Sequence, residues 1–429
     1  MASTIIHVPR RFVSHEWGGT ETVVTEIARQ QIAAGLSPKI ITSMALAHEA
    51  RETLHGIPVE RHGYCYPFFG LSAADKAAMD KKGGNLLSLS LFKALLKEDD
   101  VRLYHAHALK RLGGTVATAA RLRRKPLVVS LHGGVFDVPA AELEAMAQPM
   151  KGHFEWGRIF GAVFRSRQLL HDADLVICVG QNEYDAAKRR LPHDRISYLP
   201  NGVDSTRFAQ GDGARFRARH GLPQEALVIL NISRIDAQKN QLALLNAFAY
   251  RAAAETSAHL VLIGPETQPA YAQRLRDRIL ELGLQNRVRL LPGLRHDDPS
   301  LLDAYQACDV FALPSIHEPF GIVVLEAWSA HRPVIASAVG GLKTLIRHGE
   351  NGLLFENEAD LTLHLERLQT DRTMRQNLAT AGREEARARY DWCCIHDQLE
   401  RLYRQAERHH SRKPSSLPQP NLVPSTDHV

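Results

Sequence analysis

Short apolar runs alternate with amphipathic segments along most of this chain. Runs rich in Val, Ile and Leu lie at residues 5–8, 39–43, 103–107, 127–132, 175–179 and 196–199, and again at 227–233, 259–264, 288–292, 310–314, 334–337 and 353–355. Runs of this length and composition predict parallel strands that are buried on both faces. Between two of them, segment 21–34 places Val24, Ile27 and Ala28 on one helical face and is followed by Gly35, which predicts a helix that ends there. We therefore expect an α/β fold with two parallel sheets, each covered by helices on both faces.

The length of the chain indicates two domains. A chain of 429 residues exceeds one ordinary hydrophobic core, and we predict domains at residues 1–205 and 206–390. Two doubly wound domains in tandem place a ligand at the carboxyl ends of both sheets, in the cleft between them. Residues 411–429 contain four prolines and few apolar residues, so we predict a disordered tail.

Composition excludes several classes of function. The chain has 53 basic and 47 acidic residues, a net charge of +6, and 44% hydrophobic residues, as soluble globular proteins do. So small a charge excess does not require nucleic acid, and no recognition module is present, so we expect no nucleic-acid partner. The five cysteines are scattered without C-x-x-C spacing, which favours a reducing, cytoplasmic compartment. We expect no signal peptide and no transmembrane helix, since no apolar window approaches ~18 residues.

Two glutamates eight residues apart carry the most chemical information. Glu318 follows the apolar run 310–314 in a predicted loop, whereas Glu326 lies inside a helix predicted over 320–330. A loop carboxylate can meet sugar hydroxyls, and a carboxylate two turns along can hold the diol of a ribose. The free amides at the start of that helix, those of Phe320, Gly321 and Ile322, suit phosphate. The arrangement predicts a site for a sugar nucleotide; the alternative is a surface helix with two solvated acids.

This block resembles the donor site of the retaining glycosyltransferases of family 4, which have the GT-B fold. The family hallmark is E-x7-E, here Glu318 to Glu326, followed by small residues, the Val/Ile-rich run 334–337, and Gly340-Gly341-Leu342. The resemblance implies two Rossmann-like domains around a cleft. It also implies transfer of a sugar from a UDP- or GDP-sugar, with retention of configuration and without a metal or other cofactor.

The same resemblance implies the acceptor and two features of the domain arrangement. The acceptor would be a glycan or a lipid-linked molecule, in surface polysaccharide biosynthesis. Asn201-Gly202-Val203-Asp204 is similar to the family's interdomain turn, and Tyr390-Asp391-Trp392 is similar to the start of a helix, here 391–408, that packs back on the first domain.

Four further donor-binding residues come from positions after predicted strands. Arg234 and Lys239 follow the run 227–233, and the similar family segment sends both cations to the donor diphosphate. That charge is needed because the leaving group is a nucleoside diphosphate. Gly18 and Gly19 follow the first strand, where the family keeps a glycine-rich loop whose backbone approaches the donor phosphate. The first strand is not followed by G-x-G-x-x-G, which argues against a dinucleotide-binding oxidoreductase.

Histidines and aspartates raise the question of a metal. His132 ends the run 127–132 and resembles the family histidine that points into the cleft and contacts the transferred sugar; a structural histidine is the alternative. His105 and His107 share one strand face and form a possible metal pair, but no third ligand is placed. Asp172 and Asp174 spell the D-x-D of the other glycosyltransferase fold, and nothing else of that fold is present. We therefore expect no metal.

One segment, residues 133–171, departs from a minimal family member. It contains aromatic and basic side chains together, namely Phe154, Trp156, Phe160, Phe164, Lys151, Arg158, Arg165 and Arg167. We favour a helix packed on the first domain; the alternative is a patch for the inner face of a membrane or for a lipid-linked acceptor.

The predicted reaction assigns catalytic roles to His132 and Glu318, with Glu318 orienting the sugar hydroxyls and His132 approaching from the first domain. Closure of the cleft would exclude water and bring the acceptor to the face from which the leaving group departs. Three alternatives stay open: a GT-B phosphorylase, a sugar-nucleotide epimerase, and a non-catalytic sugar-nucleotide-binding protein. The sequence leaves the sugar, base, acceptor, linkage and oligomeric state undecided.

Overall fold

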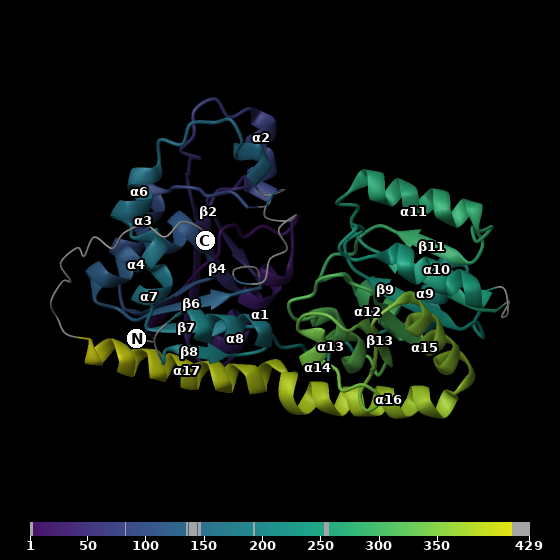
Figure 1. The fold of residues 1–429 in the computed structure, drawn as a ribbon. Helices are drawn as coiled ribbons and strands as arrows, with labels where there is room; N and C mark the ends of the chain where they lie inside the picture. Colours follow the sequence, from purple (N-terminus) through teal and green to yellow (C-terminus); the bar gives the residue numbers. More distant parts are fainter. Residues whose placement is uncertain are drawn as a thin grey trace.

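The structure is a computed structural model that describes residues 3–413 except 82, 134–135, 137–143, 145–146, 192–193 and 253–256. It contains two α/β units side by side, joined along one edge by a long C-terminal helix (Figure 1). The predicted tail begins at residue 411, but helix α17 (Trp392–Arg412) includes its first two residues, and 414–429 lie outside the described residues.

The first unit is built on an eight-stranded sheet in the order β3-β4-β2-β1-β5-β6-β7-β8. Its strands are β1 (Thr4–Val8), β2 (Ser37–Ser43), β3 (Arg51–Leu54), β4 (Ile57–His62), β5 (Val101–Ala106), β6 (Leu127–Leu131), β7 (Leu175–Cys178) and β8 (Ile196–Tyr198). All neighbouring strands are parallel except β3 and β4, which form an antiparallel hairpin. Sequence analysis missed this hairpin. Its turn, His55-Gly56, has positive φ at both residues, as a two-residue hairpin turn requires.

The second unit is built on a six-stranded parallel sheet in the order β11-β10-β9-β12-β13-β14. Its strands are β9 (Val228–Ile232), β10 (His259–Ile263), β11 (Val288–Leu291), β12 (Val310–Leu313), β13 (Val334–Ser337) and β14 (Leu353–Phe355). Each strand lies where an apolar run predicted one. The prediction of two parallel-strand α/β sheets is confirmed.

Helices cover both faces of each sheet. In the first unit these are α1 (Gly19–Ala33), α2 (Ala73–Lys81), α3 (Leu89–Lys97), α4 (Lys110–Arg123), α6 (Arg158–Val163), α7 (Leu169–Asp172) and α8 (Gln181–Arg190). In the second they are α9 (Gly213–His220), α10 (Gln241–Ala252), α11 (Pro269–Glu281), α12 (Pro299–Ala307), α13 (Ile322–Ser329), α14 (Leu342–Leu345), α15 (Glu358–Thr370) and α16 (Arg372–Glu385). Among the described residues, no helix is long and apolar enough to cross a bilayer.

Alternate strand residues face opposite helical layers, which explains why the strands are apolar throughout. In the first sheet Ile5 and Leu103 are fully buried in the core that includes residues of α1 and α17, whereas their neighbours Ile6 and Tyr104 are buried in the core that includes residues of α3 and α4. Successive residues of a strand point to opposite faces of the sheet, so a parallel sheet covered on both faces needs apolar side chains at every position.

Helix α17 returns the chain to the first unit. It follows α16 and a π-helical turn, Ala386–Tyr390, and runs along the first sheet on the side of β6 and β7 (Figure 1). Its buried side chains include Ile395, Leu399 and Tyr403. At the crossing, the amide of Val203 donates to the carbonyl of Tyr390 at 2.8 Å, so the two connections between the units lie side by side.

Candidate functional site

The two units meet where the carboxyl ends of their central strands face one another. Gly19, at the start of α1, lies opposite Ile322 at the start of α13, and a Cβ on Gly19 would be 3.7 Å from Ile322 Cδ1. Gly133, just after β6, has a positive φ of 76°, and a Cβ there would be 2.3 Å from Pro319 Cβ. A Cβ on Gly180 would be 2.8 Å from the carbonyl oxygen of Pro319. Glycine at these positions lets the loop after β12 lie directly against the first unit.

The backbone around Glu318 is held by two glycines from the loop after β13. The amide of Gly341 donates to the carbonyl of Glu318 at 2.9 Å. Gly340 has φ of +49°, and a Cβ on it would lie 2.2 Å from that same carbonyl oxygen. After Glu318 the chain turns through Gly321, with φ of +99°, into α13. The helix therefore begins at Ile322 rather than at residue 320 as predicted, because a left-handed Gly321 cannot continue it toward the N-terminus.

Glu318 and Lys239 form an ion pair in the second unit. Lys239 Nζ lies 2.7 Å from Glu318 Oε2, and the two side chains are only 15% and 12% exposed. Arg234 is more open, at 40% exposed, and its guanidinium lies 2.9 Å from Gln238 Oε1 and 3.4 Å from Asp236 Oδ2. The structure thus brings Lys239 to Glu318, and it leaves part of Arg234 accessible to an incoming anion.

Glu326 lies on the second turn of α13 and is 7% exposed. The hydroxyl of Tyr305, on α12, donates to Glu326 Oε2 at 2.6 Å. Burial raises the pKa of Glu326, while the Tyr305 hydrogen bond acts in the opposite direction. Sequence analysis missed Tyr305, because no motif connects a helix before β12 to a carboxylate after it.

The predicted phosphate-binding backbone lies where the two units touch. The side chain of Phe320 is buried, so what this residue can offer a ligand is its amide, together with those of Gly321 and Ile322 at the first turn of α13. In the first unit, Gly18 precedes α1 and its amide donates to Glu21 Oε2 at 3.1 Å. Gly19 then faces Ile322, which brings the glycine loop to the start of α13.

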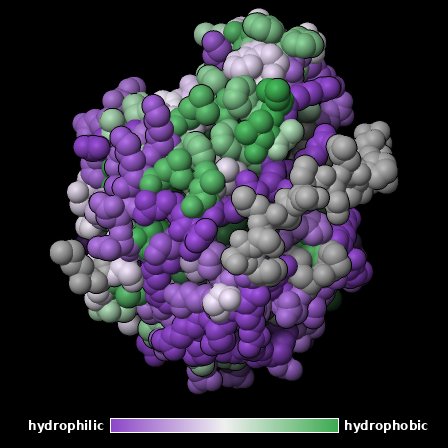
Figure 2. Space-filling view, turned by 90° about the vertical axis from the view of Figure 1, so that its left-hand side faces the viewer, coloured by the Kyte–Doolittle hydropathy of each residue, from purple (hydrophilic) through white to green (hydrophobic). Residues whose placement is uncertain are grey.

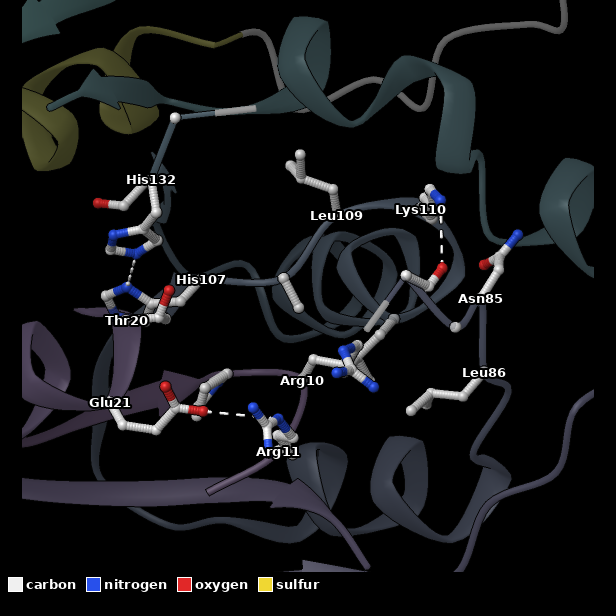
Figure 3. A pocket seen from close by; sticks show the side chains of 17 residues that line it. Arg10, Arg11, Thr20, Glu21, Asn85, Leu86, His107, Leu109, Lys110 and His132 are labelled. Carbon is white, nitrogen blue, oxygen red and sulfur yellow. Dashed lines mark hydrogen bonds and ion pairs between the residues drawn. The ribbon is translucent and has the colours of Figure 1, made fainter. Parts of the chain in front are cut away.

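His132 lines a cavity of about 330 Å³ in the first unit (Figure 3). It follows β6, and its Nε2 lies 2.9 Å from Nδ1 of His107. Burial lowers the pKa of His132 to about 4, so the imidazole is neutral at neutral pH. The amide of the adjacent Gly133 donates to Glu183 Oε2 at 3.2 Å, which holds the turn after β6.

Three basic residues line the same cavity, and sequence analysis did not single them out. The Arg10 guanidinium donates to the carbonyls of Met79, Asp80 and Lys81, so its hydrogen bonds serve the chain itself. Among the described residues, Arg11 makes two loose ion pairs at 3.7 Å, one of them with Glu21. Lys110 is exposed, with Nζ 3.4 Å from the carbonyl of Gly83. The available signal was that Arg10 and Arg11 lie in the loop after β1 and that Lys110 begins the helix after β5, both at the carboxyl edge of the sheet.

Three buried histidines lie together at this cavity, and one of them, His107, lines it. His105 and His107, considered above as a metal pair, are joined by His7, and ligand atoms of all three lie within 4.8 Å of one another. Each of their ring nitrogens already has a hydrogen-bond partner: Gln31 and His107 for His7, Tyr403 and Ser130 for His105, and His7 and His132 for His107. The absence of a metal stays a prediction.

Asp172 and Asp174, which spell D-x-D, are engaged elsewhere. Asp172 pairs with Arg165 at 2.9 Å. Asp174 is buried, pairs with Lys413 at 2.7 Å, and accepts from the amide of Leu127 at 2.9 Å. The contacts of Asp174 join the end of α17 to the start of β6.

The aromatic segment 133–171 divides between core and surface, and part of it lies outside the described residues. Phe164 is buried and packs edge-on against Phe92 at 5.2 Å between ring centroids. Phe154 is 70% exposed and stacks with Phe69, which is 62% exposed, and Trp156 lies beside them. Ile159 and Val163 of the nearby helix α6 are also exposed, and we refer to Phe69, Phe154, Trp156, Ile159 and Val163 together as the exposed aromatic patch.

Comparison with known families divides the chain where the two units divide. Residues 17–207 match the family described as Glycosyltransferase Family 4. Residues 212–385 match the family described as Glycosyl transferases group 1.

Several bacterial relatives are similar along most of the chain. The D-inositol 3-phosphate glycosyltransferase 1 of Catenulispora acidiphila is 31% identical over 402 residues, which cover 91% of each chain. The D-inositol 3-phosphate glycosyltransferase of Stackebrandtia nassauensis is 34% identical over 270 residues, and this match spans 60% of each chain.

Solved structures share the fold. Anabaena HepE in complex with UDP-glucose aligns over 93% of this chain and 98% of its own, with a TM-score of 0.69 and 23% identity. A sucrose-phosphate synthase from Thermosynechococcus elongatus aligns over 95% and 99%, with a TM-score of 0.72 and 24% identity. These neighbours support a two-domain GT-B fold.

Proposed function

The chain belongs to the family 4 glycosyltransferases and transfers a sugar from a nucleotide donor, and we propose that Glu318 and His132 face each other across the reacting sugar. The observation that carries this proposal is the contact between Gly133 and Pro319, each of which is the immediate neighbour of one candidate catalytic residue. A ligand in the cleft beside that contact would meet a carboxylate from one unit and a neutral imidazole from the other.

The donor side of the reaction follows from charge. Lys239 and Arg234 provide the positive charge that a departing nucleoside diphosphate requires, and the amides at the start of α13 add donors for its phosphates. In the structure Lys239 neutralises Glu318. A bound diphosphate would share that cation, which leaves the Glu318 carboxylate free to accept from sugar hydroxyls. Glu326, oriented by Tyr305, would hold the ribose.

We propose that the reaction retains configuration and needs no metal. Support comes from the cations and helix terminus just described, which can neutralise the diphosphate by themselves. Transfer measured after treatment with a chelator should be unchanged, and NMR of the product at early times should show the anomeric configuration of the donor. A requirement for Mg²⁺ or Mn²⁺, or an inverted product, would contradict this part.

The test of the donor site begins with binding. UDP, GDP and their common sugar conjugates should be screened by thermal shift, because a ligand at ~100 times its dissociation constant stabilises the fold by about 2.7 kcal/mol. Lys239→Met should reduce the affinity for the nucleotide that binds by about 10-fold or more, since a charge-assisted hydrogen bond is worth about 1.5–3 kcal/mol. Binding of no nucleotide would contradict the donor-site assignment.

The catalytic role of Glu318 is tested by Glu318→Gln. The loss of one orienting group should reduce kcat by about 100-fold or more, with nucleotide affinity retained. Glu350→Gln is the matched control, because Glu350 lies in the same unit and its side chain is 69% exposed. Near-normal turnover by Glu318→Gln would refute the role. Phosphate-driven cleavage of a glycan, or epimerised donor without an acceptor, would instead identify the phosphorylase or the epimerase.

For the acceptor, we propose a glycan or lipid-linked molecule at the cytoplasmic face of a membrane, in surface polysaccharide biosynthesis. The exposed aromatic patch supports this, since Figure 2 shows apolar side chains gathered on one face of the first unit. Arg158, on the same helix α6, is 85% exposed and could meet anionic headgroups. The natural chain should bind anionic vesicles at low salt, and Ile159→Ser should weaken that binding. Leu363→Ser, which replaces an exposed leucine of the second unit, should bind as the natural chain does.

A second acceptor class is favoured by the cavity itself. Arg11 and Lys110 beside His132 suit a small phosphorylated acceptor, and relatives of this chain are named for inositol 3-phosphate. Lipid-linked glycans and phosphorylated polyols should therefore be offered in parallel with the donor identified by thermal shift. Turnover of a phosphorylated polyol that is lost in Arg11→Met would decide for the second class.

A further inference from the structure

A line of hydrogen-bonded side chains runs through the interior of the first unit and ends at His132. Gln31 on α1 contacts His7 on β1, with 2.9 Å between Oε1 and Nε2. His7 Nδ1 lies 3.0 Å from His107 Nε2, and His107 Nδ1 lies 2.9 Å from His132 Nε2. Gln31 and His7 are fully buried and His107 is 7% exposed, so water does not bridge these contacts. The last link of this line is visible in Figure 3.

All three imidazoles are neutral at neutral pH. Burial lowers the pKa of His7 and of His132 to about 4, and that of His107 to well below its usual value. A neutral imidazole has one N–H and one bare nitrogen. A contact of about 3 Å between two ring nitrogens is therefore an N–H···N bond, and every N–H along the line must point in the same direction.

Gln31 decides that direction. Its Oε1 can only accept, so His7 carries its proton on Nε2 and accepts at Nδ1. His107 then donates from Nε2 to Nδ1 of His7 and accepts at its own Nδ1. His132 must donate to that nitrogen, so it carries its proton on Nε2. The amide of Gln31 is itself oriented, because its Nε2 lies 3.4 Å from the hydroxyl of Tyr403, whose other contact is His105 Nδ1 at 2.7 Å. A flipped amide would reverse every bond in the line.

We propose that Gln31, His7 and His107 are positioning residues that hold His132 as the Nε2–H tautomer and present its bare Nδ1 to a hydroxyl of the ligand in the cleft. Within the described residues, we find no hydrogen-bond partner for Nδ1 of His132. The tautomer is a property of the fold, whereas the ligand rests on the proposed glycosyltransferase function. A sugar or acceptor hydroxyl can donate to a bare nitrogen, but it could only accept from an N–H.

The line orients His132 rather than conducting protons. A proton taken up at Nδ1 of His132 could pass from its Nε2 to His107 and on to His7. It would stop there, because the carboxamide of Gln31 is not a base and the far end of the line is buried. Bonds aligned in one direction also polarise one another, which makes Nδ1 of His132 a better acceptor.

The direct test is the tautomer of His132. Chain labelled with ¹⁵N in histidine is measured by long-range ¹H–¹⁵N correlation NMR, in which bare and protonated ring nitrogens are well separated, and His132→Gln identifies the signals of His132. We expect a protonated Nε2 and a bare Nδ1 in the natural chain. A proton on Nδ1 would overturn the proposal. So would one equivalent of copurified metal, since a cation among His7, His105 and His107 would occupy the same lone pairs.

The positioning role is tested by Gln31→Met, which keeps the size of the side chain and removes the acceptor. Gln30→Met makes the same change one residue away on α1, at a partly exposed position. In Gln31→Met we expect a mixture of His132 tautomers and a rate that falls in proportion to the fraction left in the Nε2–H form. A half-populated tautomer would halve turnover, and a tenth would reduce it about 10-fold.

Two results separate this proposal from the proposed function. A Gln31→Met chain whose His132 tautomer changes while its transfer rate does not would overturn the positioning role. If the natural chain transferred no sugar from any donor, the proposed function would fail, and the NMR measurement would still decide the tautomer.

Discussion

Acidification should destabilise this protein already at mildly acidic pH, because the histidines in the core of the first unit are held neutral. Burial lowers the pKa of His7 and His132 to about 4, against about 6.5 in an unfolded chain. Between these values the unfolded chain binds more protons than the folded one, so stability falls as pH falls. The loss begins near pH 6.5 and, for these two residues, is complete near pH 4.

The size of the effect follows from the same values. At about pH 5.5 an unfolded histidine is about ten parts protonated to one part neutral, which favours unfolding by about 1.4 kcal/mol for each residue that stays neutral when folded. Burial lowers the pKa of His105 and His107 still further, so four residues contribute. Their sum, about 5–6 kcal/mol, is comparable with the whole stability of an ordinary domain, about 5–15 kcal/mol.

The assay is urea denaturation monitored by circular dichroism, repeated at several pH values between about 7.5 and 5.5. The decisive quantity is the difference between the natural chain and His7→Gln, because groups common to both chains cancel. His7→Gln should reduce the slope of stability against pH by about 1.4 kcal/mol per pH unit below pH 6, the value for one proton. His48→Gln, at an exposed histidine, is the control and should not alter the slope.

A stability that is equal at pH 7.5 and pH 5.5 would refute the reasoning. So would a slope that His7→Gln leaves unchanged, since His7 would then be protonated in the folded state or exposed to solvent. A His7→Gln variant that loses less stability than the natural chain between pH 7.5 and pH 5.5 would be the strongest support.

Two other predictions concern the donor side of the cleft. Gly340→Ala places a Cβ 2.2 Å from the carbonyl of Glu318, so turnover should fall by about 10-fold or more; Gly349→Ala, which has a similar positive φ of 81° but open space around it, should affect stability alone, and equal turnover of the two variants would contradict this explanation. Tyr305→Phe removes the hydroxyl that donates to Glu326, so donor KM should rise by about 5- to 10-fold, as expected for a hydrogen bond of about 1 kcal/mol. Because that hydrogen bond lowers the pKa of Glu326, the variant should also lose donor affinity at a higher pH as the solution is acidified, and a pH profile identical to that of the natural chain would contradict the assignment.

Much of the fold was open to prediction from local pattern. Buried parallel strands are continuous apolar runs, so β9 to β14 lie where the runs lie. The β3–β4 hairpin was missed because its strands are polar in alternation and lie at the sheet edge, where one face can stay wet. The start of α13 was misplaced by two residues because Gly321 adopts a left-handed conformation, and the apolar pattern of the helix does not encode the conformation of the residue before it.

The candidate donor residues were also readable in sequence, for a physical reason. Arg234 and Lys239 lie in the segment after β9, and Glu318 and Glu326 lie in the loop and helix after β12. The carboxyl ends of strands in one doubly wound sheet share one edge. Position in the chain therefore implied position at this edge of the sheet. What the sequence could not show is that Lys239 pairs with Glu318, or that Tyr305 reaches Glu326, because both contacts depend on the distance between side chains of separate elements.

The line from Gln31 to His132 was decided by tertiary structure alone. His7 on β1 lies opposite His105 in the register of β5, and His132 after β6 lies beside His107. His7 and His107 are 100 residues apart in the sequence. Hydrophobic periodicity encodes which residues are buried in each strand. It does not encode which strands become neighbours, so a row of histidines spread over three strands has no signature until the sheet aligns them.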